Sequence, residues 1–458
     1  MLAILVFSFL ALLFACESGD GGSPPSSIKG WIWISGSSTV NQTGTYGLKG
    51  VAAPLNTPGA RTMAVSWLDS SGKLWLFGGF GYDSAGIDDR LNDLWVFNPT
   101  TSEWTWVSGS NTVNQAGTYG TQGVADPLNV PGARMGAVSW LDPNGDLWIF
   151  GGLGYISDQN DLWKYDLISQ EWTWVSGSSF TSQPGTYGIK GIASASNIPG
   201  ARYASVSWVD SHGNLWLFGG FGFDFAGDYG DLNDLWKFDP ATLEWTWVSG
   251  GNTRNQAGIY GPQGTATSAN VPGGRVAAVS WIDSSGSHWL FGGSGSNPST
   301  PGQLNDLWKY DPPTNEWTWV SGSNTVDQAG TYGTKGTADL LNVPGARDRA
   351  ASWLDSNGKL WLFGGEGRDS ANAFSELNDL WKYDPTINEW TWVSGSITVD
   401  QAGTYGTKGT AASLNIPGAR DGAVAWIDSS GKLWLFGGNG RGSTGNRGRL
   451  NDLWRYIQ

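Results

Sequence analysis

The chain has 458 residues and a net charge of −14, with one cysteine, two histidines, 30 tryptophans and 69 glycines. The negative charge argues against nucleic-acid binding, where Lys and Arg contacts to phosphate supply most of the affinity, and the single cysteine excludes an internal disulfide framework. Glycine-marked turns combined with large aromatic packing residues are typical of many short strands, so we expect an all-β protein.

Residues 1–15 are almost entirely apolar. The run is too short for a bilayer span, which needs ~20 residues, and is typical of the core of a secretory signal. Residues 13–16 (Leu-Phe-Ala-Cys) resemble a bacterial lipoprotein signal, although Phe14 is bulky for its position and no Lys or Arg precedes the run. We predict a signal peptide over 1–16 with lipidation of Cys16; a plain cleaved signal is the alternative.

This signal predicts export, as a lipoprotein of the outer membrane or cell surface or otherwise as a secreted or periplasmic protein. The only membrane contact expected is the lipid anchor. Residues 17–30 are rich in Gly, Ser and Pro and are predicted to be a flexible tether. The predicted folded domain then covers 31–458.

One unit recurs throughout that domain. Six arginines each end a Pro-Gly-Ala-Arg or Pro-Gly-Gly-Arg segment, with spacings of 73, 68, 73, 72 and 73 residues: Arg61, Arg134, Arg202, Arg275, Arg347 and Arg420. Each arginine is followed by a Phe-Gly-Gly triplet and then by an Asn-Asp-Leu-Trp segment. A Glu-Trp-Thr-Trp-Val-Ser segment closes five of the copies, and its sixth equivalent is Trp-Ile-Trp-Ile-Ser at 31–35.

Each copy therefore contains four strand-like runs, short and rich in aromatic or β-branched residues, with turn residues between them. Runs such as Leu-Trp-Leu-Phe at 360–363 are apolar on both faces, so we expect each sheet to be covered on both sides by its neighbours in a ring. The sixth copy is split between the two chain ends, which predicts that the N-terminal strand completes the last blade. Such closure leaves no unpaired blade edge.

The order of an arginine, a Gly-Gly pair after an apolar strand, and an aromatic residue seven positions before a tryptophan resembles the kelch repeat. The resemblance covers 31–458 and implies a six-bladed β-propeller. The copies depart from the family in length, at about 72 residues against the usual ~50. The excess is a long loop between the fourth strand and the next arginine, and it carries one Tyr per copy, such as Tyr332.

The six arginines are expected near one mouth of the central channel. A ring of them could bind a carboxylate or phosphate, whereas bonds to backbone carbonyls or to an acid of the next blade would make them structural. Asp348, Arg349 and Asp421 are unusual because they adjoin the arginines in the last two copies only. These nine residues form the predicted channel-mouth ligand site.

A second candidate surface lies where the copies differ, in the segments that follow each Gly-Gly pair. In kelch-like blades these segments share a face with the long loops. The predicted binding residues on this loop face are charged: Asp83, Asp88, Asp89, Asp224, Asp228, Asp231, Glu366, Arg368 and Arg441. Ordinary solvated loop charge is the alternative for any one of them.

The tryptophans occupy five fixed positions per copy, which favours packing between blades over a sugar-binding platform. Galactose oxidase also contains kelch-type repeats, but its copper site needs a Cys–Tyr crosslink and two His ligands that this sequence does not offer. We therefore expect no cofactor and no metal.

The sequence favours a non-enzymatic scaffold of the cell envelope that binds a protein or glycan through its loop face. The alternative is a sugar-active enzyme, similar to a mutarotase or a glycosidase, at the channel mouth. There Asp348, Asp421 or Glu366 would supply the acid–base group. A purely structural or self-assembling role is a third reading.

Overall fold

The computed structural model describes residues 29–297 and 300–457. The predicted signal peptide with Cys16, and most of the predicted tether, lie outside the described residues. Inside them the chain forms strands and turns, and no helix is long and apolar enough to cross a membrane.

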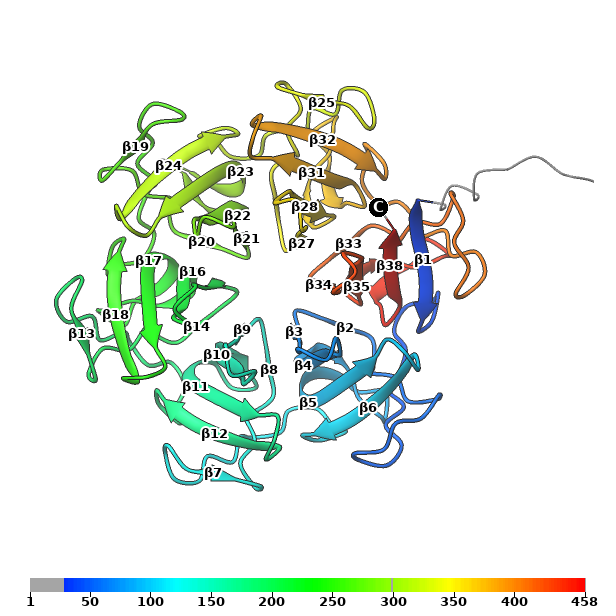
Figure 1. Cartoon of the computed structure of the whole chain (residues 1–458), viewed down its shortest axis with the longest axis horizontal. Coiled ribbons are helices and arrows are strands. Elements are labelled where there is room, and N and C mark those ends of the chain that lie inside the picture. Colours follow the sequence, from blue (N-terminus) through cyan, green and yellow to red (C-terminus); the bar gives the residue numbers. More distant parts are fainter. Residues whose placement is uncertain (1–28, 298–299, 458) are drawn as a thin grey trace, which may run out of the picture.

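The strands build six antiparallel blades around a central axis (Figure 1). The first three run from the innermost strand outward as follows. Blade 1 contains β2 (Arg61–Thr62), β3 (Val65–Leu68), β4 (Leu74–Tyr82), β5 (Asp88–Asn98) and β6 (Glu103–Ser108). Blade 2 contains β8 (Arg134–Met135), β9 (Val138–Leu141), β10 (Leu147–Gly154), β11 (Asp158–Asp166) and β12 (Glu171–Ser176). Blade 3 contains β14 (Arg202–Tyr203), β15 (Val206–Val209), β16 (Leu215–Phe223), β17 (Tyr229–Asp239) and β18 (Glu244–Ser249).

The last three blades follow the same plan. Blade 4 contains β20 (Arg275–Val276), β21 (Val279–Ile282), β22 (His288–Asn297), β23 (Thr300–Asp311) and β24 (Glu316–Ser321). Blade 5 contains β26 (Arg347–Asp348), β27 (Ala351–Leu354), β28 (Leu360–Phe363), β29 (Glu366–Arg368), β30 (Phe374–Glu376), β31 (Leu380–Asp384) and β32 (Glu389–Ser394). Blade 6 contains β33 (Arg420–Asp421), β34 (Val424–Ile427), β35 (Leu433–Phe436), β36 (Asn439–Arg441), β37 (Arg447–Arg449), β38 (Leu453–Ile457) and β1 (Gly30–Ser35).

The ring closes through its two chain ends, as the split copy predicts. Strand β1 pairs with β38 in antiparallel register, which places Trp33 opposite Trp454 and Trp31 opposite Tyr456. In Figure 1 the N-terminal strand, in blue, lies beside the C-terminal strand, in red. Strand β1 is thereby the outermost strand of blade 6.

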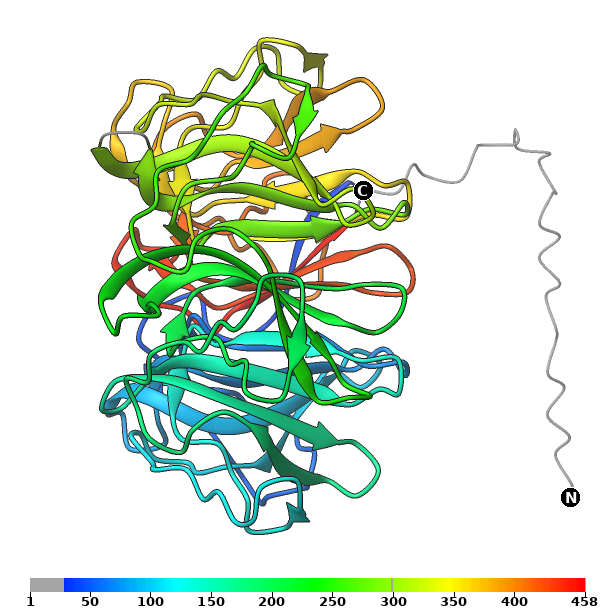
Figure 2. The same ribbon diagram turned by 90° about the vertical axis from the view of Figure 1, so that its left-hand side faces the viewer.

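The long loops do more than connect blades. Part of each loop runs down the outer edge of the next blade, where four of them add a two-residue strand: β7 (Ala125–Asp126), β13 (Ala193–Ser194), β19 (Ala266–Thr267) and β25 (Ala338–Asp339). This additional outer strand was not predicted. It pairs with the outermost strand of that blade, such as β12 or β18, and so covers an edge that could otherwise pair with another chain. Seen from the side, loops and turns extend at both ends of the strands (Figure 2).

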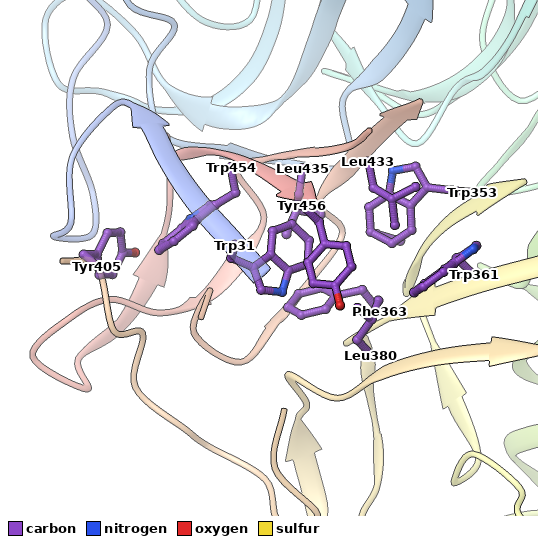
Figure 3. Close-up of a cluster of buried hydrophobic side chains, with 11 residues drawn as sticks. Trp31, Trp353, Trp361, Phe363, Leu380, Tyr405, Leu433, Leu435, Trp454 and Tyr456 are labelled. Atoms are coloured by element: carbon purple, nitrogen blue, oxygen red, sulfur yellow. The ribbon is translucent and has the colours of Figure 1, made fainter. Parts of the chain in front are cut away.

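The core consists of six apolar clusters, one between each pair of neighbouring blades. Figure 3 shows the cluster between blades 5 and 6, where Trp31 lies against Phe363 with ring centres 5.3 Å apart. Four of the five tryptophans in each copy are buried, which accords with the predicted packing role. The fifth, such as Trp319, is only half-buried on the outer rim.

The Phe-Gly-Gly triplets mark a β-bulge at the contact between blades. In blade 5, Gly364 has a φ of +63°, and a Cβ there would lie 2.7 Å from the carbonyl oxygen of Arg420 in blade 6. Only glycine combines this backbone conformation with such an approach. The triplet therefore sets the distance between blades.

Candidate functional site

The six repeated arginines are buried, and each forms an ion pair with an aspartate. Arg347 is 1 % exposed and makes two hydrogen bonds to the carboxylate of Asp379, at 2.7 and 2.8 Å. The same carboxylate accepts hydrogen bonds from the Tyr332 hydroxyl and the Trp381 indole, both at 2.7 Å. Burial, and then the charge of Asp379, raise the pKa of Tyr332 far above its ordinary value, so its hydroxyl stays a donor.

This four-residue hub recurs in every blade. Its buried aspartates are Asp93, Asp161, Asp234, Asp306, Asp379 and Asp452. Each arginine pairs with the acid of its own blade, not with that of the next blade. The arginines therefore hold strands of their own blade together, and their buried guanidinium groups are not arranged as an anion-binding ring.

Two residues after each arginine, the inner strand breaks at a left-handed residue. These six residues have φ values between 51° and 62°: Met63, Gly136, Ala204, Ala277, Arg349 and Gly422. Each donates its N–H to the carbonyl of its counterpart in the preceding blade, at 2.6 to 2.9 Å, and the sixth bond closes the circle. We call this closed ring the belt. Arg349 is its one charged member.

Below the belt the inner strands line a channel cavity of about 380 Å³. Its walls carry one serine from each of five blades: Ser66, Ser139, Ser207, Ser280 and Ser352. Several of these hydroxyls donate to the serine carbonyl of the preceding blade, as Ser207 does to Ser139 at 3.2 Å. The cavity repeats the blade pattern, so it offers little to distinguish one ligand from another.

On the side of the belt away from this cavity, at the channel mouth, the copies differ at three cross-strand positions per blade. The residue after the arginine pairs with the residue after Gly-Gly, which pairs with the residue two positions before Asn-Asp-Leu-Trp. We call each such set a mouth row. In blade order the rows are Thr62–Phe80–Arg90, Met135–Leu153–Asp158, Tyr203–Phe221–Asp231, Val276–Ser294–Gln303, Asp348–Glu366–Glu376 and Asp421–Asn439–Arg449.

The row of blade 5 is wholly acidic and surrounds Arg349. The Arg349 guanidinium lies 3.2 Å from Asp348 and 3.2 Å from Asp421, and it forms an ion pair with Glu366. Burial raises the pKa of Asp348 to about 6, although Arg349 opposes that shift. The structure thus brings the unusual residues of the last two copies into one cluster.

The cluster extends outward through two more arginines. Arg447 forms an ion pair with Glu376 and lies 3.6 Å from Glu366, and its side chain is 51 % exposed. Arg441 hydrogen-bonds to Asp400 at 2.7 Å. Blades 5 and 6 therefore present an asymmetric network of charges at the channel mouth.

Two of the predicted loop-face acids bind backbone N–H groups of their own loops. Asp83 is buried and accepts hydrogen bonds from the N–H groups of Ala85 and Ile87, at 2.8 and 2.9 Å. Asp224 does the same in blade 3. Their carboxylates are committed to backbone groups, so they are not open to a partner.

The remaining predicted loop-face residues lie around the mouth in local pairs. Asp88 pairs with Arg449, Asp89 with Arg90, Asp228 with Arg254 and Arg368 with Asp327, while burial raises the pKa of Asp231 to about 6. No group of His, Cys, Asp and Glu that could hold a metal ion occurs among the residues described.

Sequence reasoning missed Asp158 and its aromatic neighbours. Asp158 is fully buried, and neither of its carboxylate oxygens has a hydrogen-bond partner of good geometry. Burial raises the pKa of Asp158 to about 7, although the interaction with Tyr229 lowers it. The Tyr229 ring packs on Phe221 at 4.7 Å, and Phe221 contacts Tyr203 at 6.0 Å. The signal was available, because this row position changes from copy to copy inside an otherwise constant motif.

The family comparison agrees with this architecture. The model of the KLHDC2/KLHL20/DRC7 Kelch-repeats domain matches residues 127–331. Together with the six repeated blades, this decides the family. The protein is a kelch-repeat β-propeller. A search of curated proteins found no match.

Kelch domains generally mediate protein–protein interaction. In this kelch propeller the blades repeat one framework of hubs, belt and bulges, whereas the mouth rows carry the differences. Specificity for a partner has to come from residues that differ between copies, because six equal blades present six equal surfaces.

Proposed function

We propose that this kelch propeller is a binding scaffold of the cell envelope and that it holds a protein partner on the mouth rows and the loops around them. One observation carries the proposal: the variable positions converge on a single face, where they form an asymmetric surface of charges and aromatic rings. Paired rim charges and exposed aromatics are typical of protein interfaces. The apolar N-terminal run supports the envelope location, with Cys16 as the anchor. A glycan is the other ligand predicted for this face, but the dense ion-pair network favours a protein.

We expect Arg447→Glu to weaken partner binding strongly. The substitution places a third carboxylate beside Glu366 and Glu376, so a charge pattern matched to the partner becomes repulsive. The full-length protein is immobilised, incubated with an envelope extract, and the retained proteins are quantified by mass spectrometry. Retention of the partner should fall by more than about tenfold, which corresponds to ~1.4 kcal/mol.

Lys73→Glu is the matched control, since it makes the same change of charge on an exposed turn at the other end of the strands. It should retain the same proteins as the unsubstituted chain. If both variants retain the same proteins in the same amounts, the partner does not bind at the mouth of blades 5 and 6.

A sugar-active enzyme is a second candidate because the pKa of Asp348 is raised to about 6 beside Arg349. A carboxyl group that titrates near neutrality suits general acid–base catalysis. If Asp348 is the base, kcat/KM for an anionic or neutral sugar should rise with pH through about 6, because only the deprotonated form accepts a proton. Nuclear magnetic resonance of a sugar panel would detect turnover. Activity that survives Asp348→Asn would exclude this role, and Asp126→Asn on the outer edge is the control.

A further inference from the structure

The outer rim carries one half-buried tryptophan per blade, and the residue that covers it differs between blades. These tryptophans are Trp106, Trp174, Trp247, Trp319, Trp392 and Trp33, in blade order. The covering residue comes from the long loop, three positions after the hub tyrosine. It is Lys49, Gln122, Lys190, Gln263, Lys335 and Lys408 in the same order.

The four lysines close the face of their tryptophans. In blade 6, the ammonium of Lys408 lies 4.4 Å from the centre of the Trp33 ring and donates a hydrogen bond to the Gly36 carbonyl at 2.8 Å. Blades 1, 3 and 5 repeat this arrangement at 4.3 to 4.4 Å. A cation over the ring is a favourable contact and occupies the surface a ligand would need.

The two glutamines leave that surface without a cation. Gln263 reaches the Gly322 carbonyl at 3.4 Å, the long end of the hydrogen-bond range. Among the described residues, no Lys or Arg lies over the ring of Trp319 or Trp174. Beside Trp319 the structure contains a groove of about 540 Å³, within the roughly 300–1,000 Å³ typical of small-molecule sites.

The lining of this groove is polar but uncharged. Besides Trp319 and Gln263 it includes Ser323, Asn324, Gln328 and Thr331. The amide N–H of Gln328 donates to the Val326 carbonyl at 2.8 Å, which orients the side chain and leaves its carbonyl oxygen as an acceptor. The chain has 26 Lys and Arg and 40 Asp and Glu residues, so a groove that none of them lines favours an uncharged ligand.

We propose that the groove beside Trp319 binds a neutral saccharide, and that the equivalent position at Trp174 in blade 2 is a second copy of the site. The indole face accommodates the C–H face of a pyranose ring, and the surrounding amides and hydroxyls pair with sugar hydroxyls. Two sites on one rigid ring favour a polysaccharide over its monomer, because the second contact is intramolecular. This site uses none of the mouth rows, so it stands independently of the proposed protein binding.

Lys already occupies the covering position in four blades, so replacing Gln by Lys at the other two tests the proposal. The full-length protein is run by affinity electrophoresis through gels that contain an α-glucan, a β-glucan, a mannan or a xylan. We expect at least one neutral polysaccharide to retard it. Gln263→Lys should weaken that binding by roughly tenfold, as expected for the loss of a contact worth ~1.4 kcal/mol. Adding Gln122→Lys should abolish the retardation.

Lys73→Gln on an exposed turn is the control, and each polysaccharide should retard it, relative to a gel without polysaccharide, as much as it retards the unsubstituted protein. Arg447→Glu should also keep the retardation, which separates this site from the mouth. An unchanged melting temperature would show that the lysine variants fold. Absence of retardation by all four polysaccharides, or retardation that persists in the double variant, would overturn the proposal.

Discussion

Asp379→Asn should lower the free energy of unfolding by about 3–5 kcal/mol, the loss typical of breaking a buried ion pair from one side. The substitution leaves the guanidinium of Arg347, which is 1 % exposed, without a countercharge. The asparagine amide has one acceptor oxygen, so it cannot replace both carboxylate oxygens that accept hydrogen bonds from Arg347, Tyr332 and Trp381. Urea unfolding followed by tryptophan fluorescence at pH 7 measures the change.

Asp384→Asn provides the comparison within the same blade. Asp384 pairs with Lys359 at 2.5 Å, but both side chains are 21 % exposed. Solvent screens such a pair, so its loss should cost no more than about 1 kcal/mol. Equal losses for the two variants would show that the hub does not stabilise the blade more than a surface ion pair does.

The sequence predicts that the hub residues are structural, but it does not predict how they pair. The four hub positions, which carry Arg, Asp, Tyr and Trp, recur in every copy, which identifies them as framework positions and favours a structural arginine. Recurrence alone does not say which copy's aspartate meets which arginine, because every copy offers the same choice. The partner is decided by the path of the chain through three strands of one blade, and the structure places Arg347 with Asp379 of the same blade.

At the mouth, the sequence predicted Asp348, Arg349 and Asp421 and located the variable segments, but it did not show which residues of those segments face the channel. Asp83 and Glu366 both lie in variable segments, yet Asp83 caps its own loop and Glu366 pairs with Arg349 in the acidic cluster. The difference depends on strand register beyond the Gly-Gly bulge, where a slip of one residue turns every side chain to the other face. Asp158 was missed for this reason.

The rim site could not be predicted from the sequence for a similar reason. The 30 tryptophans fall at five repeated positions per copy, and this regularity predicts packing. It does not show that the tryptophan at one of the five positions stays half-buried in every copy. The change from Lys408 to Gln263 is visible in the sequence. Its consequence becomes apparent only when the long loop is known to fold back over the outer strand of the blade.

Removal of β1 is the other change from which we expect a large effect. A protein that begins at Ser37 should melt well below one that begins at Lys29, and it should associate in solution. Trp31 is 1 % exposed and Ile32 is 3 % exposed, so the deletion opens the cluster between blades 5 and 6. Loss of one buried tryptophan side chain costs about 3–5 kcal/mol. The deletion also leaves β38 as an open edge, which can pair with another chain.

Calorimetry gives the melting temperatures, and light scattering gives the association state. A synthetic peptide of residues 29–36 added to the shortened protein should restore part of the lost stability, because an open strand edge accepts an added strand. That recovery separates a gap in one blade from general unfolding. If the shortened protein does not fold, Trp31→Ala in the intact chain tests the same contact with Phe363. Melting at the same temperature with and without β1 would mean that the ring does not depend on the pairing of its two ends, and a propeller closed by other contacts would have to replace it.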